Sequence, residues 1–144
     1  MRSSERQILS LTPEEALKKL GSVTVGRAVY TYRGLPAVHF VNHVLDHGEV
    51  VIRDHGTYIP ILSGRDLATA LVYETDDIDP ATRTGWSVTV SGPARLIEDP
   101  DAAASYRDIL RPWAAGESDR IISIYPHLVT GYEITAASET YRYQ

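Results

Sequence analysis

The sequence predicts a mainly β protein, an antiparallel barrel of about six strands with helices at its connections. One observation behind this is the stretch Thr84–Glu98, which alternates apolar and mostly polar residues at period two. Another is that further strand-like segments follow one another through short turns rich in glycine, aspartate and proline. An antiparallel barrel with peripheral helices is the most economical architecture for such a pattern.

The stretch Thr84–Glu98 is the one around which the other strands are expected to gather. Its apolar face carries Trp86, Val88, Val90, Gly92, Ala94 and Leu96. Gly92-Pro93 falls in its middle, where glycine allows a sharp bend and proline donates no ladder hydrogen bond. We therefore expect a bulge or corner there, the kind of bend with which an antiparallel sheet curls towards a barrel. At the strand entry, Trp86 and Ser87 are the residues best placed to serve a ligand or a partner surface.

A first helix is expected to open at Leu11 and to end at Gly21. Thr12 is a suitable N-cap, Pro13 suits the first helical position, and Glu15 completes a capping box. The helix is short, so we expect it to cover an end of the sheet.

Strand-like segments occupy most of the remaining chain, separated by turn signals at 33–36 and 46–48. The acidic segment 76–79 is interpreted as a solvated turn, and 58–62 is ambiguous between helix and loop. The predicted strands are 23–32, 37–45, 49–53, 67–75, and a last strand over 120–134 interrupted at Pro126.

A second helix is predicted to begin at Asp99-Pro100, again with a cap followed by proline. Helical spacing continues through Tyr106, Ile109 and Trp113, which places the end of this helix just before Gly116.

Composition narrows the class of protein. At 144 residues the chain suits one domain, taken as 1–144 with a core of about 11–134 and loosely held termini. It has no cysteine and no hydrophobic signal core, so a cytoplasmic location is expected. The net charge is −5 without a basic stripe, which argues against nucleic acid as a partner. Its apolar runs are too short to span a bilayer, so no membrane partner is expected.

Few residues in the chain carry an evident chemistry. His39 and His43 share a strand face roughly 13 Å apart, too far to ligate one ion, and no metal site is predicted. Nucleophile-elbow, P-loop and dinucleotide fingerprints are absent from the sequence, and no residue qualifies as an obligatory acid or base. The best-placed group begins at Arg53, where a strand ends and the chain turns through Gly56 to Thr57. An arginine, a hydroxyl and free amides at such a point form a reasonable phosphate cradle, and the alternative is an exposed turn with Arg53 in an ion pair.

Taken together, the motifs resemble the pyridoxamine 5′-phosphate oxidase-like family of flavin-binding split β-barrels. The resemblance rests on Val-Gly-Arg at 25–27, Val-Asn at 41–42, Ile-Arg at 52–53 and Thr-Gly-Trp-Ser-Val-x-Val-x-Gly-x-Ala at 84–94. It covers roughly residues 11–134, and the last motif is its most specific part.

This resemblance implies a six-stranded antiparallel split β-barrel that forms a homodimer, with two FMN sites in the grooves between subunits. FAD, a deazaflavin or haem are the alternatives to FMN. The implied cofactor residues are Arg53, Asp54, Thr57 and Tyr58 around the phosphate, Phe40, Val41 and Asn42 along the ring, and Trp86 and Ser87 at the interface.

The chain departs from the family pattern at three of these positions. Asp54 stands where threonine is common, Tyr58 where lysine is common, and Phe40 where proline is common. A carboxylate repels a phosphate dianion, and the missing lysine removes a cation. The implied function is a flavin- or deazaflavin-dependent oxidoreductase acting on a small molecule. The alternatives are a non-catalytic module that binds flavin, deazaflavin or haem, and a dimeric barrel without cofactor.

Overall fold

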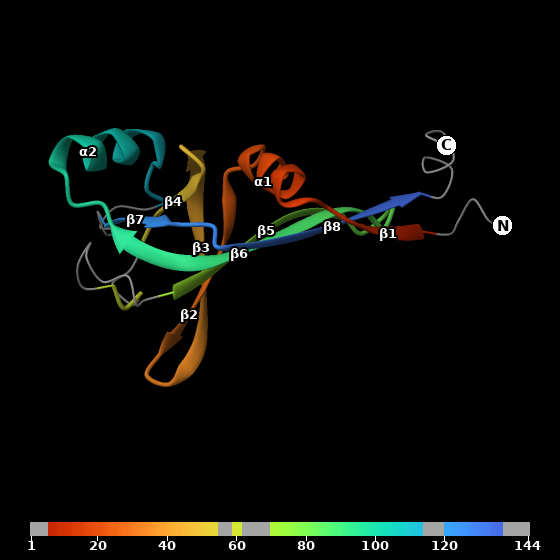
Figure 1. Ribbon diagram of the computed structural model, residues 1–144, viewed down its shortest axis with the longest axis horizontal. Coiled ribbons are helices and arrows are strands. Elements are labelled where there is room, and N and C mark those ends of the chain that lie inside the picture. Colours follow the sequence, from red (N-terminus) through yellow and green to blue (C-terminus); the bar gives the residue numbers. More distant parts are fainter. Residues whose placement is uncertain (1–5, 55–58, 62–69, 114–119, 137–144) are drawn as a thin grey trace.

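The structure is a computed structural model that describes residues 6–54, 59–61, 70–113 and 120–136 (Figure 1). The described elements follow one another in the order β1 (Arg6–Ser10), α1 (Pro13–Gly21), β2 (Val25–Tyr32), β3 (Leu35–Asp46), β4 (Glu49–Arg53), β5 (Ala70–Asp79), β6 (Thr84–Leu96), α2 (Pro100–Ile109), β7 (Ile121–Ile124) and β8 (Leu128–Ala136).

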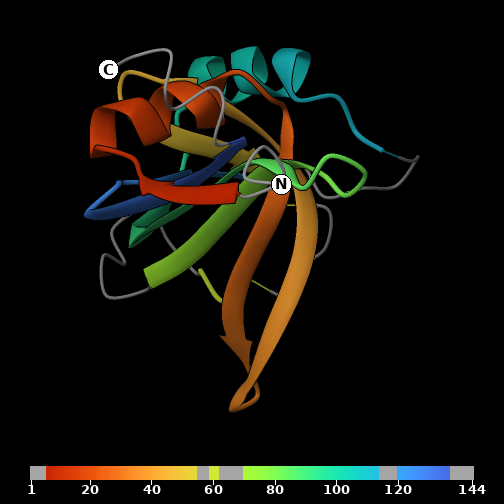
Figure 2. The same cartoon turned by 90° about the vertical axis from the view of Figure 1, so that its right-hand side faces the viewer.

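Six of these strands close into an antiparallel barrel. Neighbouring strands pair in the order β6-β5-β2-β3-β4-β7, and a further pairing between β7 and β6 closes the ring. Outside the ring, β8 pairs with the first half of β6 and β1 pairs with β8, so two strands extend the sheet beyond the barrel. The hairpin of β2 and β3 projects from the body of the barrel in both views (Figures 1 and 2). The predicted fold class is confirmed.

Strand β6 organises the sheet, as its alternation predicts. It pairs with β5 over ten positions, and its other edge changes partner along its length. Ser91 is the last position opposite β8, and Ala94 is the first opposite β7. A Cβ added to Gly92, between them, would lie 1.8 Å from the carbonyl oxygen of Tyr125, so the chains approach too closely for a side chain. The predicted corner at Gly92-Pro93 is therefore the place where β6 passes from one neighbour to the other.

The last predicted strand is in fact two strands with different partners. β7 pairs with β4 and with the second half of β6, whereas β8 pairs with β1 and with the first half of β6. A three-residue link joins them, in which the His127 amide donates to the Tyr125 carbonyl at 2.9 Å. Because Pro126 has no amide hydrogen, it cannot continue a ladder, and the chain steps sideways there.

Two segments predicted to lie outside the sheet form strands. The acidic residues Asp76, Asp77 and Asp79 belong to β5, because their backbones pair with the entry of β6 and Asp76 is bound by Arg27 at 2.6 Å. The opening residues form β1, which pairs with β8 from Arg6 opposite Ala136 onwards. The β1 pairing leaves no local signal, because its partner β8 is distant in sequence, whereas the acidic segment pairs within a hairpin in which Asp79 lies opposite Thr84.

The two helices begin where the sequence predicts. At α1 the Glu15 amide donates to the Thr12 hydroxyl at 3.1 Å, and the Thr12 amide donates to the Glu15 carboxylate at 2.8 Å. The hydrogen bonds from the Thr12 amide and hydroxyl lower the pKa of Glu15 below its ordinary value. Helix α2 ends at Ile109, earlier than predicted. Pro112 explains this, because the residue before a proline is disfavoured in helical conformation.

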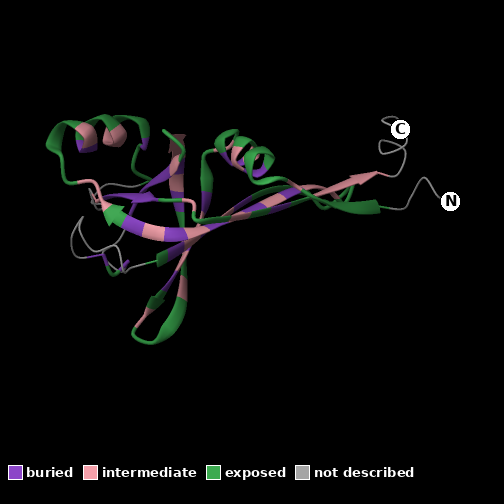
Figure 3. Cartoon of the chain, in the orientation of Figure 1, coloured by how far each residue is buried: buried purple, intermediate pink, exposed green. Residues whose placement is uncertain are grey.

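The hydrophobic core lies inside the barrel and beneath α1, and β6 buries every second residue from Trp86 to Ala94 (Figure 3). A smaller cluster lies under α2 and joins Val51, Ala103, Leu110 and Ile121. None of the helices in the described part of the chain has both the length and the apolar character needed to span a membrane.

Candidate functional site

Two residues of the implied cofactor site meet at the C-terminal end of α2. Asn42 donates its side-chain amide to the carbonyl oxygen of Arg111 at 2.5 Å. Arg53 is buried and donates Nη1 to the carbonyl of Leu110 at 2.9 Å and to that of Arg107 at 3.4 Å. The last carbonyls of a helix lack intrahelical donors, so these bonds satisfy the end of α2. Arg53 is therefore a buried side chain joined to α2, and the turn that follows it lies outside the described residues.

Asp54 is fully buried and forms an ion pair with a residue that the sequence did not single out. Its carboxylate accepts from Arg120 Nη1 at 2.9 Å, and its amide donates to the Arg120 carbonyl at 3.0 Å. The Nη2 atom of Arg120 donates to the carbonyls of Ile59 and Ile61 at 3.0 and 2.7 Å. This pair ties the segment after β4 to the start of β7. Thr57 and Tyr58 belong to that segment but lie outside the described residues.

The other two residues implied to lie along the ring have different environments. Phe40 is half exposed on the outer face of β3 and makes an edge-to-face contact with Trp113, with ring centroids 5.4 Å apart. Val41 points the opposite way and is fully buried in the barrel core. Only Phe40 and Asn42 of this group therefore present their side chains on the outer face of the sheet.

Beside Asn42 lies a cavity of about 300 Å³, here called the α2 cavity. It opens between β3, the chain before β2 and the end of α2. Its lining residues are Thr24, Val25, Asn42, His43, Val44, Ile109, Leu110, Arg111 and Trp113. The sequence missed Arg111 and Trp113 as candidates, because it placed them inside or beside a longer helix.

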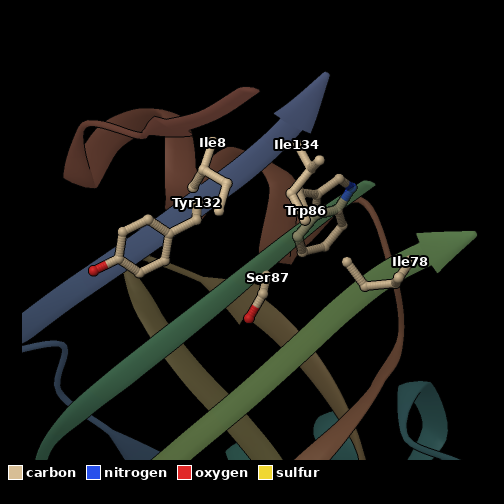
Figure 4. A pocket seen from close by; sticks show the side chains of 6 residues that line it. All are labelled: Ile8, Ile78, Trp86, Ser87, Tyr132 and Ile134. Carbon is tan, nitrogen blue, oxygen red and sulfur yellow. The ribbon is translucent and has the colours of Figure 1, made fainter. Parts of the chain in front are cut away.

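Trp86 and Ser87 lie elsewhere, at a second hollow of about 300 Å³ on the sheet extension (Figure 4). The other lining residues, Ile8, Ile78, Tyr132 and Ile134, are apolar or aromatic and come from β1, β5 and β8. The pairing places Gly85 in one row between Ile134 and Ile78, so a position without a side chain creates the depression. Gly85 has φ 141°, and a Cβ there would lie 2.1 Å from the Asp77 carbonyl. Lys19 of α1 approaches Trp86 from the opposite side, with Nζ 6.0 Å from the ring centroid.

A charged cluster of Arg27, Glu74 and Asp76 lies on β2 and β5, on the face of the sheet that also carries Ser87. Arg27 Nε donates to Glu74 at 2.6 Å, and Nη2 donates to Asp76 at 2.6 Å. Burial and the hydrogen bond with Asp76 raise the pKa of Glu74 above its ordinary value. Burial alone would lower the pKa of Arg27, but the two carboxylates raise it. Val-Gly-Arg was a family signal in the sequence, and here its arginine holds β2 to β5.

The face around this cluster is apolar and exposed. Strand registers from β1 to β3 place one set of side chains on the same side of the sheet, away from α1. Its large exposed apolar members are Ile8, Ile78, Leu128, Tyr132, Val38 and Phe40, each between 45% and 69% exposed. Exposed apolar side chains that gather on one face in this number often mark a surface that binds something.

A buried polar pair lies inside the barrel, away from this face. His43 Nε2 is hydrogen-bonded to the Leu20 carbonyl at 2.8 Å, so this nitrogen donates and Nδ1 accepts from the Tyr73 hydroxyl. Burial lowers the pKa of His43 and raises that of Tyr73, which keeps both side chains neutral. This histidine is thus a satisfied core residue that joins α1, β3 and β5.

The comparisons with known proteins agree with this architecture. A family model described as pyridoxamine 5′-phosphate oxidase matches residues 12–139. The uncharacterised protein Rv0080 of Mycobacterium tuberculosis is 40% identical over 140 residues, which cover 95% of this chain and 92% of that protein.

Solved structures add two similar proteins. One, a candidate pyridoxamine 5′-phosphate oxidase from Corynebacterium glutamicum, is 27% identical with a TM-score of 0.70, over 90% of this chain and 95% of its own. The FAD-binding protein from Mycobacterium smegmatis has a similar fold, with 24% identity and a TM-score of 0.64 over 88% of this chain and 98% of its own. On the family match and these relatives, the chain belongs to the pyridoxamine 5′-phosphate oxidase family.

Proposed function

We propose that this protein is a homodimeric flavin-binding oxidoreductase that transfers electrons to or from a small molecule, with FMN as the expected cofactor. The observation that carries the proposal is the arrangement of the implied cofactor residues along the ring and at the interface. Phe40 and Ser87 lie on one exposed sheet face, but three strand spacings separate them, roughly 15 Å. A second copy of the chain packed on this face would bring the β3 residues of one subunit near the β6 residues of the other.

The exposed apolar face supports the dimer. A stable dimer of this type buries on the order of 2,000 Å² or more in total. Such an interface would cover Tyr132, Leu128 and Val38, which are otherwise more than half exposed. It would also remove more water from the Arg27 cluster, whose carboxylates are already neutralised in part by the arginine.

The residues present fit the ring of a flavin. Apolar and aromatic side chains at the Trp86 hollow suit a planar ring system, and the Ser87 hydroxyl and the Asn42 amide can hydrogen-bond its polar edge. The phosphate end is less well matched, since Nη1 of Arg53 is engaged by α2 and Asp54 is paired with Arg120. A flavin is also supported by the M. smegmatis relative, which is named as an FAD-binding protein.

When bound, a flavin supplies the redox chemistry, and the protein would position it and exclude water. Phe40 would contact one side of the ring region, and Trp86, which is largely buried, would border the groove with the part of its side chain that lines the hollow. No side chain on the described part of the sheet face is placed as an obligatory acid or base. The proton needed in turnover would therefore come from the reactants or from water.

The absorbance spectrum of the purified protein tests this proposal. We expect flavin bands after purification or after reconstitution with FMN, and bleaching of these bands by NADPH or by a reduced deazaflavin. Mass analysis of the released pigment distinguishes FMN from FAD and deazaflavin. A Soret band would identify haem instead, and a protein that takes up none of these ligands would contradict the proposal.

A second candidate is a module that binds the cofactor without turnover. The engagement of Arg53 and Asp54 in contacts within the chain favours it, because both are then less available to anchor a phosphate. This candidate predicts flavin bands that neither donor bleaches. A dimeric barrel without any cofactor remains the third alternative, and it predicts a colourless dimer.

A further inference from the structure

A hollow of about 280 Å³ lies on the outer face of the barrel, toward the opposite end of β6 from Trp86. It is here called the Arg95 hollow, and its lining residues are Glu49, Pro93, Arg95, Ser123 and Tyr125. They come from the start of β4, the second half of β6, and β7 with the residue that follows it (Figure 1). None of them is among the residues implied to hold the cofactor, so this hollow lies apart from the implied cofactor site.

Strand pairing brings the lining side chains together. Alternate residues of β6 and β7 belong to the barrel core, so the residues between them face outward. Arg95 lies opposite Ser123, and two residues away on each chain the Tyr125 amide donates to the Pro93 carbonyl at 2.9 Å. Glu49 begins β4, which pairs with the other edge of β7. The hollow is thus set between an arginine and a proline on one side and a glutamate on the other.

The two charged side chains of the hollow are close but are not joined by a hydrogen bond. Arg95 Nη2 lies 3.8 Å from Glu49 Oε1, and Arg95 forms no other ion pair within the described part of the chain. The Arg95 side chain is 45% exposed and that of Glu49 is 29% exposed. A partly exposed pair at this distance contributes little to stability, so both charges are available to a ligand.

Glu49 is held in place from the side of β7. The buried hydroxyl of Ser123 donates to its Oε1 at 2.6 Å, whereas its Oε2 has no hydrogen bond to any residue that the structure describes. Asp46 lies opposite Glu49 in the β3–β4 hairpin, but its carboxylate is engaged by the Tyr106 hydroxyl at 2.7 Å. Glu49 is therefore an oriented carboxylate with one oxygen left for a ligand.

The remaining lining and the size of the hollow narrow the class of ligand. Tyr125 is about half exposed and offers an aromatic ring, with the Pro93 ring beside it. A simple anion would meet the carboxylate of Glu49, and a simple cation would meet Arg95, so the pair disfavours both. An α-amino acid bears its carboxylate and its ammonium on one carbon, which suits two opposite charges 3.8 Å apart. A volume at the lower end of the range for ligand sites also favours a molecule of this size.

We propose that the Arg95 hollow binds a free α-amino acid with an apolar or aromatic side chain. Arg95 receives the carboxylate and Glu49 receives the ammonium, both through charge-assisted hydrogen bonds. The side chain of the amino acid lies against Tyr125 and Pro93. This binding goes beyond the proposed function and does not depend on it.

Calorimetry on the intact protein tests the proposal with a set of ligands that share one phenyl group. They are L-phenylalanine, 3-phenylpropionate, which lacks the ammonium, and phenethylamine, which lacks the carboxylate. At neutral pH we expect saturable binding of phenylalanine, tighter than that of either analogue by roughly fivefold or more and weaker as salt rises. An analogue that binds as tightly as phenylalanine would overturn the proposal, because only one of the two charges would then be used.

Two substitutions assign the two charges. Arg95→Gln should weaken phenylalanine and 3-phenylpropionate by roughly fivefold and leave phenethylamine within about twofold. Glu49→Gln, which keeps an acceptor oxygen, should weaken phenylalanine and phenethylamine and spare 3-phenylpropionate. Tyr125→Ala should weaken all three ligands. The matched controls are Arg33→Gln at the β2–β3 turn and Glu14→Gln on α1, both exposed, and they should leave all three unchanged.

The pattern across the two charge substitutions decides the outcome. If each of them weakens all three ligands equally, or if neither weakens any, the charges do not recognise the ligand and the inference is wrong. Thermal melting of each variant shows that it is folded at the temperature of the titration.

Phenylalanine titrations with and without FMN separate this inference from the proposed function. Measured along β6, Ser87 and Arg95 are roughly 25 Å apart, so phenylalanine affinity should agree within about twofold in the two titrations. Competition between FMN and phenylalanine would place the hollow in the flavin site and overturn the inference. Phenylalanine binding by a protein that takes up no flavin would support the hollow and contradict the proposed function.

Discussion

Replacing Arg120 by methionine should destabilise the protein far more than replacing Asp54 by asparagine, although both changes break the same ion pair. The Asp54 side chain is fully buried, whereas that of Arg120 is 23% exposed. Without Arg120, a buried carboxylate loses its cation, and the carbonyls of Ile59 and Ile61 lose a donor. Removing the cation of a buried ion pair in this way lowers the free energy of unfolding by about 3–5 kcal/mol.

Asp54→Asn is the milder change, because asparagine keeps a hydrogen-bonding oxygen and the guanidinium left behind can reach water. We expect a cost of about 1–2 kcal/mol for this variant, in the range of a single weakened hydrogen bond. For a chain of this length, about 4 kcal/mol corresponds to a fall in Tm of roughly 10–15 °C. Arg120→Met should therefore melt well below Asp54→Asn.

Urea unfolding and thermal melting of both variants and of the double variant measure this difference. The double variant should be less damaged than the sum of the two single changes, with a coupling of about 1–3 kcal/mol between the neighbouring sites. Equal losses in the two single variants, or losses below about 1 kcal/mol in both, would refute the argument that the buried carboxylate dominates.

Three further predictions follow from other parts of the fold. Gly92→Ala should lower the free energy of unfolding in urea by more than about 2 kcal/mol, because its Cβ would meet the Tyr125 backbone at 1.8 Å. The control Ser91→Ala, at the next position, should lower it by well under about 1 kcal/mol. Similar losses in the two variants would argue that β6 can shift away. His43 is buried neutral with a pKa below its ordinary value of 6.5, so the unfolded chain binds the additional proton as the pH falls below about 6.5. Stability should then decline by up to about 1.4 kcal/mol per pH unit until the folded-state pKa is reached, and an unchanged pH slope in His43→Gln would contradict this origin. Tyr132→Asp should convert the proposed dimer to a monomer in sedimentation. Tyr125→Asp should not, because Tyr125 is also exposed but lies on the link outside the strands. A wild-type monomer at micromolar concentration would reject the dimer itself.

Features that depend on neighbours in sequence were predicted well. The alternation of β6 gives its buried face directly, and the Thr12–Glu15 capping box forms at the start of α1 as its residues suggest. The end of α2 was misplaced although the signal was present in Pro112, because the spacing of Tyr106, Ile109 and Trp113 continued past it. Helical periodicity describes where apolar residues fall and does not by itself locate a helix end.

Features that depend on residues distant in sequence could not be predicted from local sequence patterns. Asp54 was expected to face a bound phosphate, but its partner Arg120 is 66 residues away and nothing in the local sequence connects the two. The same holds for β1 and for the separation of β7 from β8, which follow from pairing across the whole chain. Resemblance to a family supplied the candidate residues, and their roles toward a cofactor stay predictions.

The three-residue link between β7 and β8 has a consequence for how the chain can vary in length. Its ends are fixed to opposite halves of β6, at Ile124 opposite Ala94 and at Leu128 opposite Ser91. One inserted residue would shift β8 by one position and exchange its two faces, so that Tyr132 would turn toward α1 and Glu133 toward the apolar face. The turn between β2 and β3 has no such constraint, since even a Cβ on Gly34 would meet nothing within 4 Å. Insertions and deletions among related chains should therefore accumulate at that turn and avoid the link.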